Sequence, residues 1–245
     1  MLNINLLLFS ILIHVMGDYY LQSNGLAQSK KDSFKKLVIH AGLYAVVTIL
    51  FFLVFYRGEA LLLGAIFSFS HFLVDSLKFI AIRSKRVNSA QSYVYAIDQI
   101  LHLLAILILT IIFSDKLLSR DWGVHLATLS VNRGLILRFV LTLLLISKPV
   151  NISFKILFSK FRPKSSSDQS ADRSGEIIGT LERILIMLML LANQYTAIWL
   201  IFTAKSIIRF DKDNENKGFA EYFLIGTFYS IIATVVIHYL IFKIS

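Results

Sequence analysis

The sequence contains no cysteine, only two prolines, and fewer acidic residues (15) than basic ones (25). Without cysteine the chain has neither disulfides nor thiolate ligands, so any metal must be held by nitrogen and oxygen. It also lacks a glycine-rich nucleotide loop and a Gly-x-Ser-x-Gly elbow. The first apolar run, 6–16, has no basic region before it and no small-residue cleavage site after it, so we expect a retained helix.

Apolar residues are what the chain has in excess. They make up 56% of its 245 residues, above the roughly half that soluble domains contain. Several runs reach the ~20 residues that cross a ~30 Å hydrocarbon layer as a helix. We therefore expect an all-α, polytopic integral membrane protein.

The apolar runs predict about seven transmembrane helices, near 3–22, 37–56, 60–82, 94–113, 134–158, 177–204 and 220–242. The fifth run is interrupted by Arg138, Lys148 and Pro149, so a short span followed by an interfacial helix over 150–161 is an open alternative. The serine-rich stretch 160–174 is the expected linker. We expect three parts: a helical core over 1–115, a connecting region over 116–174, and a C-terminal pair of helices over 175–245.

Basic residues predict the orientation in the membrane. The loops after the first, third and fifth runs are rich in lysine and arginine, at 30–36, 83–86 and 160–173, whereas the alternate loops are poorer. By the positive-inside bias, the amino terminus lies outside and the carboxyl terminus is cytoplasmic. Topology and anionic lipid headgroups explain the net charge of +10, so we expect membrane lipids and no nucleic acid as partners.

Histidine and aspartate recur four residues apart in this sequence. The three pairs and one further histidine are His14 and Asp18, His71 and Asp75, Asp98 and His102, and His40. Four residues make about one helical turn, so each pair shares a helix face. In the expected topology all seven residues lie near the cytoplasmic side, where antiparallel neighbouring helices bring them together. The sequence thus predicts one site for a divalent metal, foremost zinc, in one or more ions.

A structural role for these residues stays open. Hydrogen bonds between histidine and aspartate on different helices would also offset the cost of placing ionisable groups in a bilayer.

The same residues resemble a known family. The chain contains the pattern His14-xxx-Asp18-Tyr-Tyr-Leu-Gln22, then Lys30 and His40, then His71-xxx-Asp75-xx-Lys78, then Asp98-Gln99-xx-His102, and in this pattern it resembles a bacterial membrane family known as domain of unknown function 3307. The resemblance covers about 1–115 closely, and the second half is similar to longer members at 175–183, 204–209 and 221–227. It implies a multi-pass protein of the bacterial inner membrane and names no substrate.

More distantly, the His-xxx-Asp elements are similar to the LexA-regulated, membrane-bound metal-dependent hydrolases and to the zinc phospholipase C and P1 nuclease group. The soluble members of that group are helical phosphodiesterases whose histidines and aspartates hold a cluster of zinc ions. This resemblance implies zinc and a hydrolase, although the chain lacks the group's amino-terminal tryptophan ligand.

We therefore expect an integral-membrane, metal-dependent hydrolase that acts on an amphiphilic phosphoester or ester at the cytoplasmic face. Such a metal lowers the pKa of a bound water and polarises a phosphoryl or carbonyl oxygen. Asp75 or Asp98 would serve as the base, and Lys78, about one turn past Asp75, would neutralise the head group of a phospholipid or lipid phosphate. The alternatives are a transporter of divalent metal or protons, and a scaffold with a structural metal.

The second half offers one candidate for substrate binding. Glu182 and Arg183 begin the sixth predicted helix on the expected cytoplasmic side. The guanidinium of Arg183 has the donor geometry to bind a substrate phosphate, and a salt bridge that anchors the helix is the structural alternative.

Overall fold

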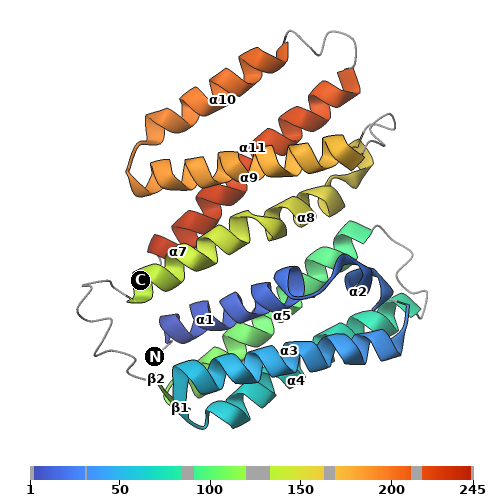
Figure 1. The fold of residues 1–245 in the computed structure, drawn as a ribbon, viewed down its shortest axis with the longest axis vertical. Helices are drawn as coiled ribbons and strands as arrows, with labels where there is room; N and C mark the ends of the chain where they lie inside the picture. Colours follow the sequence, from blue (N-terminus) through green and yellow to red (C-terminus); the bar gives the residue numbers. More distant parts are fainter. Residues whose placement is uncertain are drawn as a thin grey trace. The chain divides into compact units, whose positions relative to one another are not determined.

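The computed structural model of the chain describes residues 3–30, 32–83, 91–119, 133–162, 169–210 and 217–243, and these are mostly helical (Figure 1). The chain divides into two compact units, 1–141 and 142–245. We predicted three parts, whereas the structure has this single division, inside a helix. The predicted linker over 160–174 and the basic loop over 83–86 fall partly outside the described residues.

Four helices of the first unit pack against one another and carry all seven predicted ligands (Figure 1). They are α1 (Ile4–Val15), α3 (Phe34–Phe55), α4 (Ala60–Arg83) and α5 (Gln91–Phe113). A π-helix, η1 (Met16–Tyr20), continues α1, and the short α2 (Asn24–Ser29) leads to α3. Strand β1 (Tyr56–Gly58) pairs antiparallel with β2 (Leu117–Ser119), with Tyr56 opposite Ser119, so it ties the α3–α4 turn to the end of α5.

An apolar core fills the end of this unit near the two strands. Phe9 of α1 packs edge-on against Phe52 of α3, with ring centroids 5.9 Å apart, and against Tyr56 at 5.1 Å. Leu63 and Phe67 of α4 and residues of α5 complete the buried cluster. Burial of these large side chains stabilises this end of the bundle by the hydrophobic effect, at about 1.5–3 kcal/mol for each fully buried side chain.

The remaining helices make up the second unit, except that α7 begins in the first unit and crosses the boundary after Leu141. They are α7 (Arg133–Ile146), α8 (Lys148–Leu157), the 3₁₀ turn η3 (Ser159–Phe161), α9 (Gln169–Leu191), α10 (Tyr195–Phe210) and α11 (Lys217–Lys243). The break between α7 and α8 lies at Ser147, because Pro149 has no backbone N–H for the helical ladder and its ring crowds the preceding turn. Helix α11 packs on α8 and α9.

The single helix predicted over 177–204 is wrong. Helix α9 ends at Leu191, and α10 begins at Tyr195 and turns back along α9 (Figure 1). Asn193 makes this reversal with φ of 57°, a left-handed conformation that asparagine adopts more readily than most residues. Positions 205 and 209 therefore lie on α10 and not on one straight helix with Glu182.

In the part of the chain that the structure describes, five helical segments are long and apolar enough to cross a membrane: Phe34–Phe55, Ala60–Arg83, Ser92–Phe113, Gly134–Leu157 and Glu221–Lys243. The apolar helix Ile4–Tyr20 is shorter. Large apolar side chains such as Leu50, Phe69 and Ile112 are exposed on these helices, as expected where lipid replaces water. The prediction of an all-α membrane protein fits this structure.

Candidate metal centre

The structure brings all seven predicted ligands into one buried cluster in the first unit. Two come from the end of α1 and from η1, one from α3, two from α4 and two from α5. Each is between 1% and 8% exposed: His14, Asp18, His40, His71, Asp75, Asp98 and His102. Neighbouring helices thus bring the imidazoles and carboxylates of all three sequence pairs, and His40, into one cluster.

Asp18 lies at the middle of this cluster because of the π-helix. The N–H of Leu21 bonds to the carbonyl of Met16, five residues back, and this wider turn replaces the α-helical one. One oxygen of Asp18, Oδ1, lies 3.1 Å from Nε2 of His40 and 3.3 Å from Nε2 of His71. Single π-turns inside helices are frequent at functional sites.

The closest contacts join different helices rather than the pairs four residues apart. His14 Nδ1 is 4.0 Å from Asp18, and His71 Nδ1 is 3.9 Å from Asp75, whereas Nε2 of His40 approaches Asp75 to 3.4 Å. The sequence spacing therefore groups residues that the structure also brings together, and the tertiary fold selects their partners.

The imidazole rings form a compact group. His102 stacks on His14 with ring centroids 4.9 Å apart and lies 4.4 Å from His71. Tyr44 of α3 stacks on His71, with ring centroids 3.7 Å apart. Gly17 makes room for this phenol, since a Cβ built at Gly17 would lie 2.4 Å from the Tyr44 ring.

Many buried polar atoms of the cluster make no hydrogen bond with any part of the chain that the structure describes. They are both ring nitrogens of His14 and of His71, Nε2 of His40 and of His102, Oδ1 of Asp18 and Oδ1 of Asp98. Buried polar groups without hydrogen bonds are costly. The concentration of such atoms in this cluster therefore points to a ligand that would satisfy them.

The donor set fits a divalent first-row metal. Three groups, each with one ligand atom per residue within 4.8 Å of the others, are possible: His14, Asp18 and His71; His40, His71 and Asp75; Asp75, Asp98 and His102. Nδ1 of His102 lies 2.8 Å from the backbone carbonyl of Asp98, which can only accept, so Nδ1 carries the proton and Nε2 keeps its lone pair. Such a second hydrogen bond commonly orients histidine ligands.

Two lysines border the cluster; both stand in the family pattern, but the sequence predicted a role in the site only for Lys78. Lys30, next to α2, is buried and places Nζ 3.2 Å from Asp75 and 3.8 Å from Asp18. Burial lowers the pKa of Lys30, but the charges of Asp18 and Asp75 outweigh it and raise that pKa above its ordinary value, so the side chain stays cationic. Lys78, which the sequence singled out, donates to Oδ2 of Asp98 at 2.7 Å.

A chain of neutral side chains holds Asp98 from the other direction. Gln99 donates from Nε2 to Oδ2 of Asp98 at 3.1 Å, and its Oε1 accepts from the Tyr19 hydroxyl at 2.9 Å. The hydroxyl of Tyr95 lies 2.7 Å from that of Tyr19. Because Lys78 and Gln99 both bind Oδ2, the second oxygen of Asp98 is left facing the imidazoles.

The stretch of sequence that carries the cluster matches a known protein family. Residues 6–127 match the model of a family described as Protein of unknown function (DUF3307). The chain belongs to this family. No curated protein and no solved structure matches the chain, so the likeness to metal-dependent hydrolases stays a prediction. All seven predicted ligands, Lys30 and Lys78 lie within the stretch that matches DUF3307.

Glu182 and Arg183 lie outside the DUF3307 stretch, in the second unit. Arg183 is 2% exposed and donates through Nε to the carbonyl of Ile146, at the end of α7. It also donates to Asn151 of α8 at 2.6 Å and to Ser230 of α11 at 3.0 Å. These contacts give Arg183 a structural role, because it satisfies a carbonyl at the α7–α8 break. The binding of substrate by Glu182 and Arg183 stays a prediction.

Proposed function

We propose that this DUF3307 member is an integral-membrane, metal-dependent hydrolase of an amphiphilic phosphoester or ester. The observation that carries the proposal is the group of buried imidazole and carboxylate atoms without hydrogen bonds, gathered from four helices. The contact between Oδ1 of Asp18 and Nε2 of His40 relieves part of the cost of burial. Nε2 of His14 and Nε2 of His102 have no carboxylate partner among the described residues, and each unsatisfied buried group costs about 1–3 kcal/mol.

The proposed ligands are the four histidines and the carboxylates of Asp18 and Asp75. A divalent ion bound there, foremost zinc, would act as a Lewis acid that lowers the pKa of a water ligand and polarises the ester oxygen. Asp98 is the better of the two predicted bases. Its Oδ2 is occupied by Lys78 and Gln99, while Oδ1 accepts no hydrogen bond from the described residues and is the atom that would take up the proton.

The membrane placement of the site belongs to the same proposal. The basic stretches at 30–36 and 83–86 put the cluster near the cytoplasmic face of the bacterial inner membrane, with the amino terminus outside. The reversal of the chain at Asn193 changes our expectation for the carboxyl terminus. Since α9 and α10 run in opposite directions, they add an even number of crossings, and α11 would then end outside and not in the cytoplasm.

Metal content tests the proposal directly. The protein purified without chelator should carry at least one equivalent of zinc, manganese or iron by elemental analysis, and His71→Ala should lose most of it. His238→Ala is the matched control, because His238 lies in the second unit and stacks on Phe242. Wild type without metal, or equal loss in both variants, would remove the metal hypothesis.

Turnover tests the hydrolase itself. A panel of phospholipids, lipid phosphates and neutral lipid esters should contain a substrate that the metal-loaded protein cleaves and that the chelator-treated protein does not. If the protein binds metal but cleaves no member of the panel, the scaffold reading replaces the hydrolase.

Transport is the second candidate, and one observation favours it. Ser10, Thr48, Ser68 and Thr110 are buried on the four helices that carry the cluster, and they extend a polar face beyond it. The apolar core around Phe9 and Phe52 then fills the end of the bundle near the strands, which favours a site that is open to one side only. Uptake of zinc or of protons into proteoliposomes, dependent on His71, would support transport instead.

A further inference from the structure

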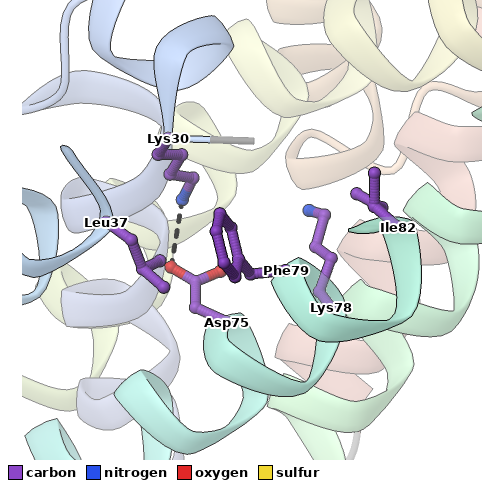
Figure 2. Close-up of a pocket in the computed structure, with 6 residues that line it drawn as sticks. All are labelled: Lys30, Leu37, Asp75, Lys78, Phe79 and Ile82. Carbon is purple, nitrogen blue, oxygen red and sulfur yellow. Dashed lines mark hydrogen bonds and ion pairs between the residues drawn. The ribbon is translucent and has the colours of Figure 1, made fainter. Parts of the chain in front are cut away.

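A small hollow opens beside the metal centre, on the side where the two lysines lie. Its lining residues are Lys30, Leu37, Asp75, Lys78, Phe79 and Ile82 (Figure 2). In the view of Figure 2 the Phe79 ring lies between the two lysines, and Nζ of Lys30 points at Asp75. The hollow has room for about one water molecule, so a larger group would lie at its mouth.

Two lysines and one carboxylate, Asp75, line the hollow. Lys30 gives one hydrogen bond to Asp75, and Lys78 gives one to Asp98. An ammonium carries three donors, so each lysine has donors left for a ligand. Phosphate oxygens accept several such hydrogen bonds at once. Arg83 does not line the hollow, but its guanidinium lies nearby, 6.0 Å from the centre of the Phe79 ring.

The surroundings of the hollow are apolar. Leu37 of α3 and Phe79 and Ile82 of α4 line it beside the lysines. Phe34, at the start of α3, is exposed, and its ring lies 5.9 Å from that of Phe79. A ligand that enters here therefore meets cations and apolar side chains together, which is the chemistry of an amphiphile at a membrane surface.

We propose that this hollow binds the phosphate of a lipid, with Lys30 and Lys78 as donors and the acyl chain lying along Phe79 and Ile82. The inference rests on the proposed function and narrows its substrate from phosphoester or ester to a lipid that carries an anionic phosphate. The phosphate would then lie next to Asp75 and Asp98, whose carboxylates hold the two lysines in place.

Binding to the purified full-length chain tests the inference without any turnover. Chelator-treated protein in a neutral detergent is titrated with dioctanoyl phosphatidic acid, dioctanoylglycerol and inorganic phosphate, and dissociation constants are measured by thermophoresis. Phosphatidic acid should bind at least about tenfold more tightly than either partial ligand, because only it uses both the cations and the apolar surface. Equal affinity for inorganic phosphate, or for the neutral diglyceride, overturns the proposal.

Variants of the lysine at the mouth localise the binding. Lys78→Gln should weaken binding of phosphatidic acid by about tenfold, the usual value of one hydrogen bond between charged groups, and Lys78→Arg should restore most of it. Lys36→Gln is the matched control, since Lys36 is an exposed lysine of α3 that does not line the hollow. If Lys78→Gln does not fold, Arg83→Gln, next to the Phe79 ring, should weaken binding several-fold. Equal behaviour of the mouth variants and the control refutes the site.

Failure here and failure of the hydrolase give different results. If metal binds and a neutral ester is cleaved while phosphatidic acid binds without regard to Lys78, only the phosphate site is wrong. If phosphatidic acid binds as expected but the protein holds no metal, the hydrolase is wrong and the lipid phosphate site stands.

Discussion

Replacement of Gly17 by alanine perturbs the candidate metal centre without touching a proposed ligand. The added Cβ would lie 2.4 Å from Cδ2 and 2.7 Å from Cε2 of Tyr44, about 1 Å short of the 3.4 Å at which ordinary contact begins. The Tyr44 ring is 5% exposed and stacked 3.7 Å from His71, so it has little room to withdraw. The clash should be passed on to His71.

The size of the effect follows from overpacking. Extra methyl groups in a well-packed interior cost about 1–3 kcal/mol, and the better helix propensity of alanine returns up to about 1 kcal/mol. We expect a net loss of roughly 1–2 kcal/mol in the free energy of unfolding, or about 2–8 °C in the midpoint of thermal unfolding. Metal content should fall together with stability, because His71 takes part in two of the three possible ligand groups.

Thermal unfolding in detergent and elemental analysis are the assays. Gly42→Ala is the control, since a Cβ at this exposed α3 glycine meets nothing within 4 Å and should leave stability equal or slightly higher. In a Tyr44→Leu background, Gly17→Ala should cost little, because the ring that it strikes is gone. If Gly17→Ala matches wild type in both assays, or costs as much without Tyr44, the close approach does not shape the site.

Three further changes test other parts of the structure. Asp98→Asn should keep metal and fold but reduce turnover at least 100-fold, as expected for loss of a general base, and parallel loss of metal would contradict that role. Arg183→Ala should lower the unfolding free energy by roughly 2–4 kcal/mol through the unpaired carbonyl of Ile146 and its other partners, measured by denaturant titration in detergent; an unchanged midpoint would contradict the structural role. Cysteine at the exposed position of Lys36 should react with an impermeant thiol reagent from the cytoplasm, and cysteine at that of Glu59 should react from outside. A reporter fused after residue 243 should lie outside. The opposite pattern would invert the topology.

Features that depend on short stretches of chain were predictable. Apolar runs near 60–82 and 94–113 became α4 and α5 with ends within a few residues, because burial in lipid needs only length and composition. The His71–Asp75 spacing placed both side chains on one face of α4 for the same reason, since helical geometry is local. The two-stranded pair β1–β2, in contrast, joins residues about sixty positions apart and left no pattern in the sequence.

A single residue in the sequence marks the break between α9 and α10. Asn193 sits within the apolar run 177–204, where asparagine is a poor helix former and tolerates the left-handed conformation that ends a helix. Reading it as a helix end would have predicted the hairpin of α9 and α10.

The sequence by itself determined which residues form the cluster, because histidine and aspartate are costly in lipid and recur at one helical turn. Only the tertiary structure decided how they are used. Lys30 reaches Asp75 across 45 residues, and Asp18 turns towards His40 and His71 through a π-helix that no spacing announced. Such contacts depend on how separate helices pack, and packing is decided by the fit of whole surfaces, which a linear pattern does not contain.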